Sequence, residues 1–254
     1  MFTNSVLVTG CNRGIGLELV KQLAPQTKHL FAGCLYPHNA NEIDGLSEHH
    51  KHVVKLHLDV TNHESITHAV SVMEGVLASE GEGLNCVINN AGVLPVINSI
   101  NDVTVQQLAN TFDVNAIGPT MVSKACLPLL KKASAKESGN RMGVSRAAVL
   151  NISSTAGSME NPRRMDKLFY TYRPSKMALN MFARNLSIGA QEDNILVCNV
   201  NPGWVQTDMG GPEASRTVQE AVESMLFLMS TFDGSNTAAN AEGFYNWNGE
   251  VIPW

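Results

Sequence analysis

The sequence contains few charged and few aromatic residues. It lacks the positive net charge typical of nucleic-acid-binding proteins and the long apolar runs of membrane-spanning proteins. Charged residues make up 16% and aromatic residues 6% of its 254 residues, and the formal net charge is −5. A negative net charge argues against a nucleic-acid partner, because such partners favour a basic face. No apolar run approaches the roughly 20 residues that span a bilayer, so we expect no membrane partner.

Cysteine is scarce as well. The five cysteines lie far apart, and none of them belongs to a C-x-x-C pair. This pattern gives no sign of a disulfide framework or a metal site, and it is typical of reduced thiols in a cytosolic protein. The first five residues lack the basic and apolar stretches of a signal peptide. We therefore expect a cytoplasmic protein without a bound metal.

Short apolar runs alternate with longer segments of helical periodicity along the whole chain. The predicted strands are Val6–Thr9, His29–Cys34, Val53–Leu58, Cys86–Asn89, Ala147–Ile152, Leu196–Val200 and Gly243–Tyr245. Such alternation is typical of a parallel sheet wrapped by helices. The sequence therefore predicts a single α/β domain over residues 1–254. We expect a doubly wound, Rossmann-like fold with a seven-stranded, mostly parallel sheet and helices on both faces.

A glycine cluster joins the first predicted strand to the first predicted helix. Gly10, Gly14 and Gly16 would let the backbone approach a pyrophosphate, whose charge is stabilised at a helix N-terminus. The spacing is G-x-x-x-G-x-G rather than the more common G-x-G-x-x-G. Structural turns also contain such clusters, but the position directly after the first strand favours a cofactor loop.

The choice between NAD and NADP depends on one acid and one base. An acidic residue about 20 positions after the glycines would bind the ribose 2′-hydroxyl of NAD. After the second predicted strand, no acid occurs before Glu42. The guanidinium of Arg13, inside the glycine loop, could hold the 2′-phosphate of NADP; an ordinary surface charge is the alternative. NADP(H) is favoured, and NAD(H) stays open.

Four motifs occur in a fixed order: Thr9–Gly16 (T-G-x-x-x-G-x-G), Asn89–Gly92 (N-N-A-G), Tyr172–Lys176 (Y-x-x-x-K), and Pro202-Gly203 followed by Thr207. Together they resemble the short-chain dehydrogenase/reductase family over nearly the whole chain. The loop Gly10–Gly14 and the ending Phe244–Trp254 are most similar to sniffer-type carbonyl reductases and to C-factor proteins.

The reacting centre is expected around Tyr172 and Lys176, which share one face of a helix because they are four residues apart. A free phenol titrates near pH 10, and a neighbouring cation lowers that pKa. The resemblance implies that Tyr172 is the general acid in carbonyl reduction. It also implies that Lys176 tunes the pKa of the phenol and binds the nicotinamide ribose. Pro174 fits only the first turn, so we expect the helix to begin near Tyr172.

The resemblance assigns two more catalytic roles. Ser154 would hydrogen-bond the substrate oxygen and so polarise the carbonyl; a helix cap is the alternative. Asn115 would kink a central helix and position a water for a proton relay; it could also satisfy buried backbone groups, and the two roles are compatible. Ser154 and Tyr172 stand further apart than the family usually places them, which indicates a longer loop at about residues 158–170 beside the substrate.

The remaining matches concern the cofactor and the substrate. Further cofactor contacts are implied for Asn12, Ile15, Asp59, Val60, Asn89, Asn90, Ala91, Gly92, Pro202, Gly203, Val205 and Thr207. Among them, Asp59 would accept from the adenine amine or simply start a helix, and Val205 and Thr207 would fix the carboxamide or shape their loop. The expected substrate lining is Val93, Leu94, Met165, Phe169, Trp204 and Met209, although these side chains could also be packing. The segment 207–217 is expected to form a small, mobile lid.

The predicted function is an NADPH-dependent carbonyl reductase that acts on an aldehyde, a ketone or a quinone. An apolar lining suits apolar carbonyl compounds. Two alternatives stay open: an NAD-dependent alcohol dehydrogenase, and a cofactor-binding signalling protein of the C-factor type. The resemblance also implies a homodimer formed through the helices that carry Asn115 and Tyr172.

Overall fold

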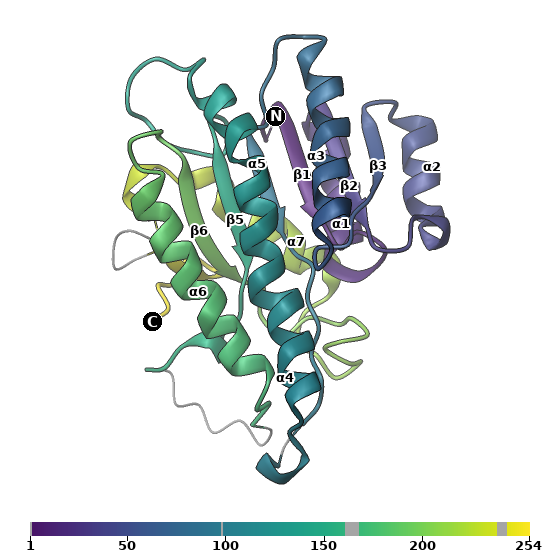
Figure 1. The fold of residues 1–254 in the computed structure, drawn as a ribbon, viewed down its shortest axis with the longest axis vertical. Coiled ribbons are helices and arrows are strands. Elements are labelled where there is room, and N and C mark those ends of the chain that lie inside the picture. The colour runs from purple at the N-terminus through teal and green to yellow at the C-terminus, as the bar shows by residue number, and fades with distance from the viewer. Residues whose placement is uncertain (1, 98, 161–167, 238–242) are drawn as a thin grey trace.

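A seven-stranded sheet forms the centre of the molecule. The computed structural model describes residues 2–97, 99–160, 168–237 and 243–254 (Figure 1). The strands are β1 (Ser5–Thr9), β2 (His29–Cys34), β3 (Val53–His57), β4 (Cys86–Asn89), β5 (Ala148–Ile152), β6 (Leu196–Asn201) and β7 (Phe244–Asn246). Every predicted strand is present, with ends shifted by no more than about one residue.

The strand order is β3-β2-β1-β4-β5-β6-β7, and each neighbouring pair is parallel. The expectation of a mostly parallel sheet is confirmed, and β7 also pairs parallel with β6. Between β1 and β4 the order reverses. In open parallel sheets, ligands bind at the carboxyl ends of the strands at such a switch point.

Helices cover both faces of the sheet (Figure 1). One face carries α1 (Gly14–Leu23), α2 (Asn41–His49) and α7 (Val218–Thr231). The other face carries α3 (His63–Ala78), α5 (Gly118–Ser134) and α6 (Tyr172–Gly189). Because both faces are covered, strands such as β1 and β5 are buried along their whole length and read as continuous apolar runs. The predicted doubly wound α/β fold is confirmed.

A π-helical turn, Asp113–Ile117, interrupts the long helical stretch between α4 (Val105–Phe112) and α5. Gly118 follows this turn, and a Cβ at that position would lie only 2.9 Å from the Val60 Cγ2 atom. The helix therefore passes close to the end of β3. Turns of this kind are frequent at functional sites because they re-aim side chains.

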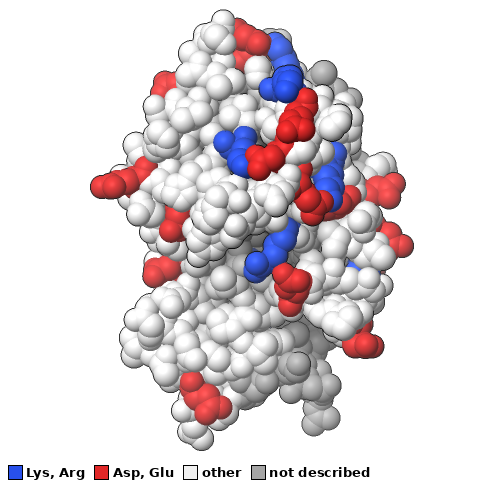
Figure 2. Space-filling view, turned by 90° about the vertical axis from the view of Figure 1, so that its right-hand side faces the viewer, with Lys and Arg blue, Asp and Glu red and all other residues white. Residues whose placement is uncertain are grey.

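Charge is distributed unevenly over the face drawn in Figure 2. Lysine, arginine and acidic side chains interleave over its upper half, whereas the half toward the carboxyl ends of the strands carries few of them. Ion pairs on the surface include Lys21–Glu42, Lys28–Glu80 and Lys55–Asp44. Within the described residues, no helix is long and apolar enough to cross a membrane, and no group of three or more metal-ligating side chains occurs.

Candidate active site

The glycine loop folds tightly against the turn that follows β4. Gly10 has φ +72°, and a Cβ there would lie 2.9 Å from the Ala91 Cα atom. A Cβ on Gly16 would lie 2.2 Å from the Gly10 carbonyl oxygen. Both positions therefore exclude a side chain, and the loop keeps its backbone open toward the carboxyl edge of the sheet.

The N-terminus of α1 is left free for an anion. Within the described residues, no side chain caps this helix, and its first turn contains no acid. Asn62, Thr104 and Thr217 cap α3, α4 and α7, whereas α2 and α6 lack a side-chain cap as α1 does. The first N–H groups of a helix need an acceptor, and a pyrophosphate placed there would supply it. The residues present fit a dinucleotide.

The Asn89–Gly92 turn braces this end of the sheet. The Asn90 amide donates to the Thr9 carbonyl over 2.9 Å, and the Thr9 hydroxyl accepts from the backbone N–H groups of Asn90 and Ala91 over 3.0 Å each. Asn89 is buried, and its amide donates to Asn151 Oδ1 over 2.9 Å. Its side chain therefore braces the strands, which leaves Ala91 and Gly92 at the groove.

Tyr172, Ser154 and Lys176 meet at the carboxyl end of β5. Tyr172 is the first residue of α6, as predicted, and its hydroxyl is hydrogen-bonded with that of Ser154. The Lys176 ammonium donates to the Ile152 carbonyl over 2.8 Å and lies 5.8 Å from the centre of the Tyr172 ring. Ser154 also accepts from the Ala156 N–H over 3.2 Å, so the expected capping role coexists with the contact to Tyr172.

The pKa values of this pair shift in opposite directions. Burial raises the pKa of Tyr172 to about 12, although the hydrogen bond with Ser154 acts the other way. Burial lowers the pKa of Lys176 to about 8. The expected lowering of the phenol pKa by the lysine is therefore not found here, because the cost of burying a phenolate is the larger effect. At neutral pH, Tyr172 is protonated and can donate its proton.

Asn115 lies in the π-helical turn and is fully buried. Its amide donates to the Val93 carbonyl over 2.9 Å and to the Ser175 hydroxyl over 3.0 Å, and its oxygen accepts from the Val93 N–H over 2.8 Å. Its side chain thus satisfies both backbone groups of Val93, and the residue also lies in the turn that interrupts the helix. Ser175 in turn donates to the Tyr172 carbonyl over 2.7 Å. Sequence reasoning missed Ser175, and its only signal was its place inside the Tyr172–Lys176 motif.

The loop between β6 and α7 reaches across to the glycine loop. A Cβ on Gly14 would lie 3.4 Å from the Thr207 methyl carbon. Arg13 Nε lies 3.0 Å from Asp208 Oδ2, and both side chains are largely exposed. Arg13 therefore pairs with an acid that the sequence analysis did not single out. The signal that could have found Asp208 was its position next to Thr207.

Several contacts stabilise this short loop. The Trp204 indole donates to the Gly210 carbonyl over 2.7 Å, and the Gly211 N–H donates to the Thr207 carbonyl over 2.8 Å. The Arg216 guanidinium stacks 3.6 Å above the Trp247 ring. These contacts tie the segment to itself and to the chain end after β7, and the mobility expected of it stays a prediction.

Comparison with known proteins identifies the family. The sequence pattern described as short chain dehydrogenase matches residues 4–217. The chain belongs to the short-chain dehydrogenase family. The resemblance seen in the sequence is thus confirmed, and the protein is an oxidoreductase of that family.

Similar proteins include two carbonyl reductases of known structure. Carbonyl reductase Sniffer of D. melanogaster is 38% identical, with a TM-score of 0.93, over 99% of this chain and 100% of its own. The NADPH-bound carbonyl reductase from chicken fatty liver is 39% identical, with a TM-score of 0.93, over 99% of this chain and 94% of its own. The C-signal protein of Myxococcus xanthus is 36% identical over 171 residues, which cover 67% of this chain and 93% of that protein.

The other predicted site residues of this short-chain dehydrogenase fall into three groups. Asn12 and Ile15 belong to the glycine loop, and the Asn12 amide donates to the Tyr36 carbonyl over 2.8 Å. Asp59 Oδ1 accepts from the N–H and the hydroxyl of Thr61, so it closes the turn before α3, whereas Asn62 caps that helix. Of the β6–α7 loop residues, Val205 is buried and Gly203 has φ +84°.

The expected substrate lining lies mostly at the mouth of the site. Phe169 has a left-handed backbone with φ +47°, and its ring centre is 6.5 Å from that of Tyr172. A non-glycine residue held in this region is strained, which is common at functional sites. Val93, Trp204 and Met209 are exposed, and Leu94 is partly buried. Met165 lies outside the described residues.

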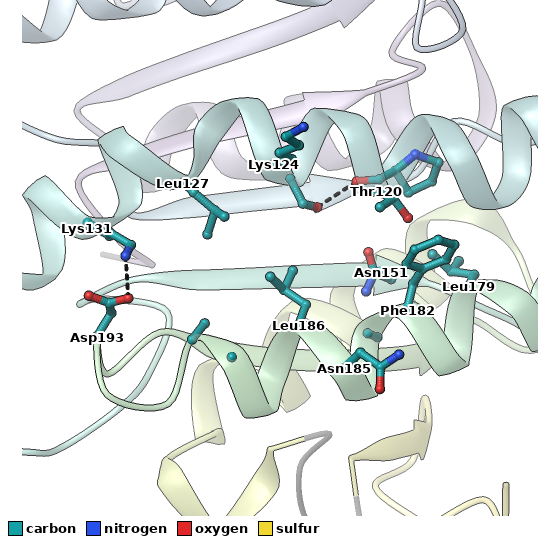
Figure 3. A pocket seen from close by; sticks show the side chains of 15 residues that line it. Thr120, Lys124, Leu127, Lys131, Asn151, Leu179, Phe182, Asn185, Leu186 and Asp193 are labelled. Atoms are coloured by element: carbon teal, nitrogen blue, oxygen red, sulfur yellow. Dashed lines mark hydrogen bonds and ion pairs between the residues drawn. The ribbon is translucent and has the colours of Figure 1, made fainter.

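A second hollow of about 450 Å³ lies between α5 and α6 (Figure 3). Its walls include Leu127, Leu179 and Leu186, and the ion pair of Lys131 with Asp193, 2.8 Å long, closes one end. Ser154, Tyr172 and Lys176 do not line it. The hollow therefore belongs to an outer helix face rather than to the reacting centre.

Proposed function

We propose that this protein is an NADPH-dependent carbonyl reductase that uses Tyr172 as its general acid. The observation that carries the proposal is the protonated phenol of Tyr172, hydrogen-bonded with Ser154 and next to the buried ammonium of Lys176. An acid at this position can complete the reduction of a carbonyl, because the oxygen gains a proton as the carbon gains a hydride.

The chain's own groups suit a bound dinucleotide. The uncapped start of α1 would hold the pyrophosphate, and Tyr172 and Lys176 would face the nicotinamide ribose. Thr207 and the backbone of Val205 would orient the carboxamide. Arg13 would bind the 2′-phosphate, and the segment just after β2 presents the exposed Leu35 and Tyr36 instead of an acid. When bound, NADPH supplies the hydride.

The chemical step then depends on three side chains. Ser154 donates to the carbonyl oxygen and polarises it. Tyr172 transfers its proton to that oxygen as negative charge develops, which yields the alcohol. Lys176 stabilises the resulting phenolate, which regains a proton from solvent. The carbon receives the hydride, so charge and atoms balance.

The substrate class is an apolar aldehyde, ketone or quinone. The mouth of the site presents the exposed Val93, Trp204 and Met209 and the partly buried Phe169. A carbonyl compound without ionic groups matches such a lining, because no charged partner is needed to compensate its burial.

Turnover of a panel of aldehydes, quinones and dicarbonyls with NADPH tests the proposal. Tyr172→Phe should lower kcat by about 10²–10⁴-fold, because the general acid is lost, while NADPH binding measured by fluorescence is retained. Tyr170→Phe is the matched control, since Tyr170 lacks a lysine four residues later, and it should stay near wild-type activity. Full activity in Tyr172→Phe would contradict the proposal.

A signalling role is the second candidate, favoured by the 36% identity to the C-signal protein. The two functions separate in a cell that lacks this protein. If Tyr172→Phe restores the missing phenotype as well as the wild type does, the signalling role is the correct one. If it does not, the reductase activity is required. A comparison of kcat/KM for NADPH and NADH likewise decides between a reductase and an NAD-dependent alcohol dehydrogenase.

We further propose a homodimer in the cytosol. The outer face of α6 exposes Met181, Phe182 and Ile188, and Phe182 also lines the hollow of Figure 3. A second copy would cover these apolar side chains. All five cysteines are free and buried, as expected for a reducing compartment. Recovery of the protein in a secreted fraction would contradict the cytosolic location.

A further inference from the structure

The ion pair between Arg13 and Asp208 spans two loops on opposite sides of the cofactor groove. Arg13 precedes α1 and belongs to the glycine loop, whereas Asp208 follows β6 by several residues. Their Nε and Oδ2 atoms are 3.0 Å apart, and the side chains are 79% and 76% exposed. Both side chains can therefore rotate, and the pair is held only weakly, as is usual for exposed pairs.

Asp208 is itself held in place by the fold of its loop. Thr207 packs on Gly14, its hydroxyl accepts from the Gly210 N–H over 3.0 Å, and its carbonyl accepts from Gly211 over 2.8 Å. The carboxylate is thus presented to Arg13 from a fixed backbone. The guanidinium of Arg13 stands at the end of a longer side chain that is 79% exposed, so it is the group that can swing away from the pair.

We propose that Asp208 determines cofactor preference by competing with the 2′-phosphate of NADP(H) for the guanidinium of Arg13. This inference rests on the proposed NADPH dependence. The Asn12 amide ties the glycine loop to Tyr36 after β2, which is the side where the adenine ribose would lie. Arg13 faces Asp208 instead, so it must leave the carboxylate before it can bind a 2′-phosphate there.

The competition has a definite direction. A protein that binds a ligand only in one of two arrangements has its apparent affinity reduced by the fraction of molecules in the competent arrangement. Asp208 therefore weakens the binding of a 2′-phosphate, and it has no such effect on NAD(H), which lacks this group. Removal of the carboxylate raises the fraction of free Arg13 and shifts the preference further toward NADP(H).

Binding of 2′,5′-ADP and 5′-AMP to the full chain, measured by calorimetry, tests this directly and needs no turnover. Asp208→Asn should tighten 2′,5′-ADP relative to 5′-AMP by about two- to fivefold, the range that an exposed ion pair supplies. In an Arg13→Ala background the same substitution should leave this relative affinity unchanged, because the guanidinium for which Asp208 and the 2′-phosphate compete is absent. Glu213→Gln is the matched control: it removes one negative charge from the same loop, and Glu213 has no ion pair within the described residues.

Each result decides between the claims. The competition is overturned if the affinity for 2′,5′-ADP relative to 5′-AMP is unchanged or lower in Asp208→Asn. It is also overturned if this relative affinity rises equally in the Arg13→Ala background or in Glu213→Gln, which would indicate a general effect of charge. If Arg13→Ala alone leaves 2′,5′-ADP binding unchanged, Arg13 does not bind the 2′-phosphate, and the basis of the NADPH proposal fails as well. If Arg13→Ala weakens binding and Asp208→Asn has no effect, only the present inference fails.

Discussion

Tyr172 and Lys176 illustrate how burial acts on two kinds of acid. The neutral form is favoured in each case, so the pKa of the phenol rises to about 12 and that of the ammonium falls to about 8. At neutral pH, the phenol is therefore neutral and the amine is still mostly charged, so the two groups do not form an ion pair. A phenol that stays protonated is the form that carbonyl reduction requires.

The lowered pKa of Lys176 makes the stability of the fold depend on pH. Between about pH 8 and the ordinary value of 10.5, the unfolded chain binds more protons at this residue than the folded chain does. The free energy of unfolding should therefore rise with pH in this window. We expect the rise between pH 7.5 and 9.5 to be about 1–2 kcal/mol larger in the wild type than in Lys176→Met, measured by urea unfolding. Parallel pH profiles of the two proteins would contradict this.

At the scale of secondary-structure elements, the π-helical turn positions Asn115 between two segments of the site. The Asn115 side chain satisfies both backbone groups of Val93 and also contacts Ser175, which bonds the first carbonyl of α6. The turn therefore fixes the start of the catalytic helix relative to the loop after β4. This is a structural function that a straight helix could not perform.

Truncation of Asn115 should destabilise the protein strongly. In Asn115→Ala, the N–H and C=O of Val93 lose their partners in a partly buried place, and the loss of a buried partner costs about 1–3 kcal/mol. We expect a loss of about 2–4 kcal/mol in the free energy of unfolding in urea. Asn110→Ala, on the exposed side of α4, is the control and should change it by less than about 0.5 kcal/mol. Equal effects of the two substitutions would show that the network around Val93 carries no stability.

At the scale of the whole molecule, the two helical layers differ in what they leave uncovered. The α6 side exposes Phe182 and Met181 beside the hollow between α5 and α6, and α7 on the opposite face exposes Phe227. A twofold interface needs an apolar patch that is complementary to itself. The α5–α6 surface with its hollow fits this requirement better than the single exposed ring of Phe227 on α7 does.

The predicted homodimer can be tested with one charge on each face. Phe182→Asp should convert a dimer of about twice the 27.5 kDa chain mass into a monomer, because it buries an unpaired carboxylate in the interface. Phe227→Asp, on the other layer, should leave the mass unchanged. Light scattering coupled to size exclusion gives both masses. A monomeric wild type, or a dimer that survives Phe182→Asp, would contradict the assignment.

The sequence by itself determined the elements and most of the site. Apolar runs and helical periodicity are local signals, so they predicted the strands to within about a residue, and the single proline at position 174 predicted that α6 begins near Tyr172. The four-residue spacing of Tyr172 and Lys176 placed them on one helical face.

Only the tertiary structure decided the relations between distant segments. The contact of Ser154 with Tyr172, the pairing of Arg13 with Asp208 and the bridge through Ser175 join parts of the chain that local patterns cannot connect. The direction of the Tyr172 pKa shift was predicted wrongly for the same reason. Spacing identifies a neighbouring cation, but the desolvation that outweighs it exists only once the chain has closed around the phenol.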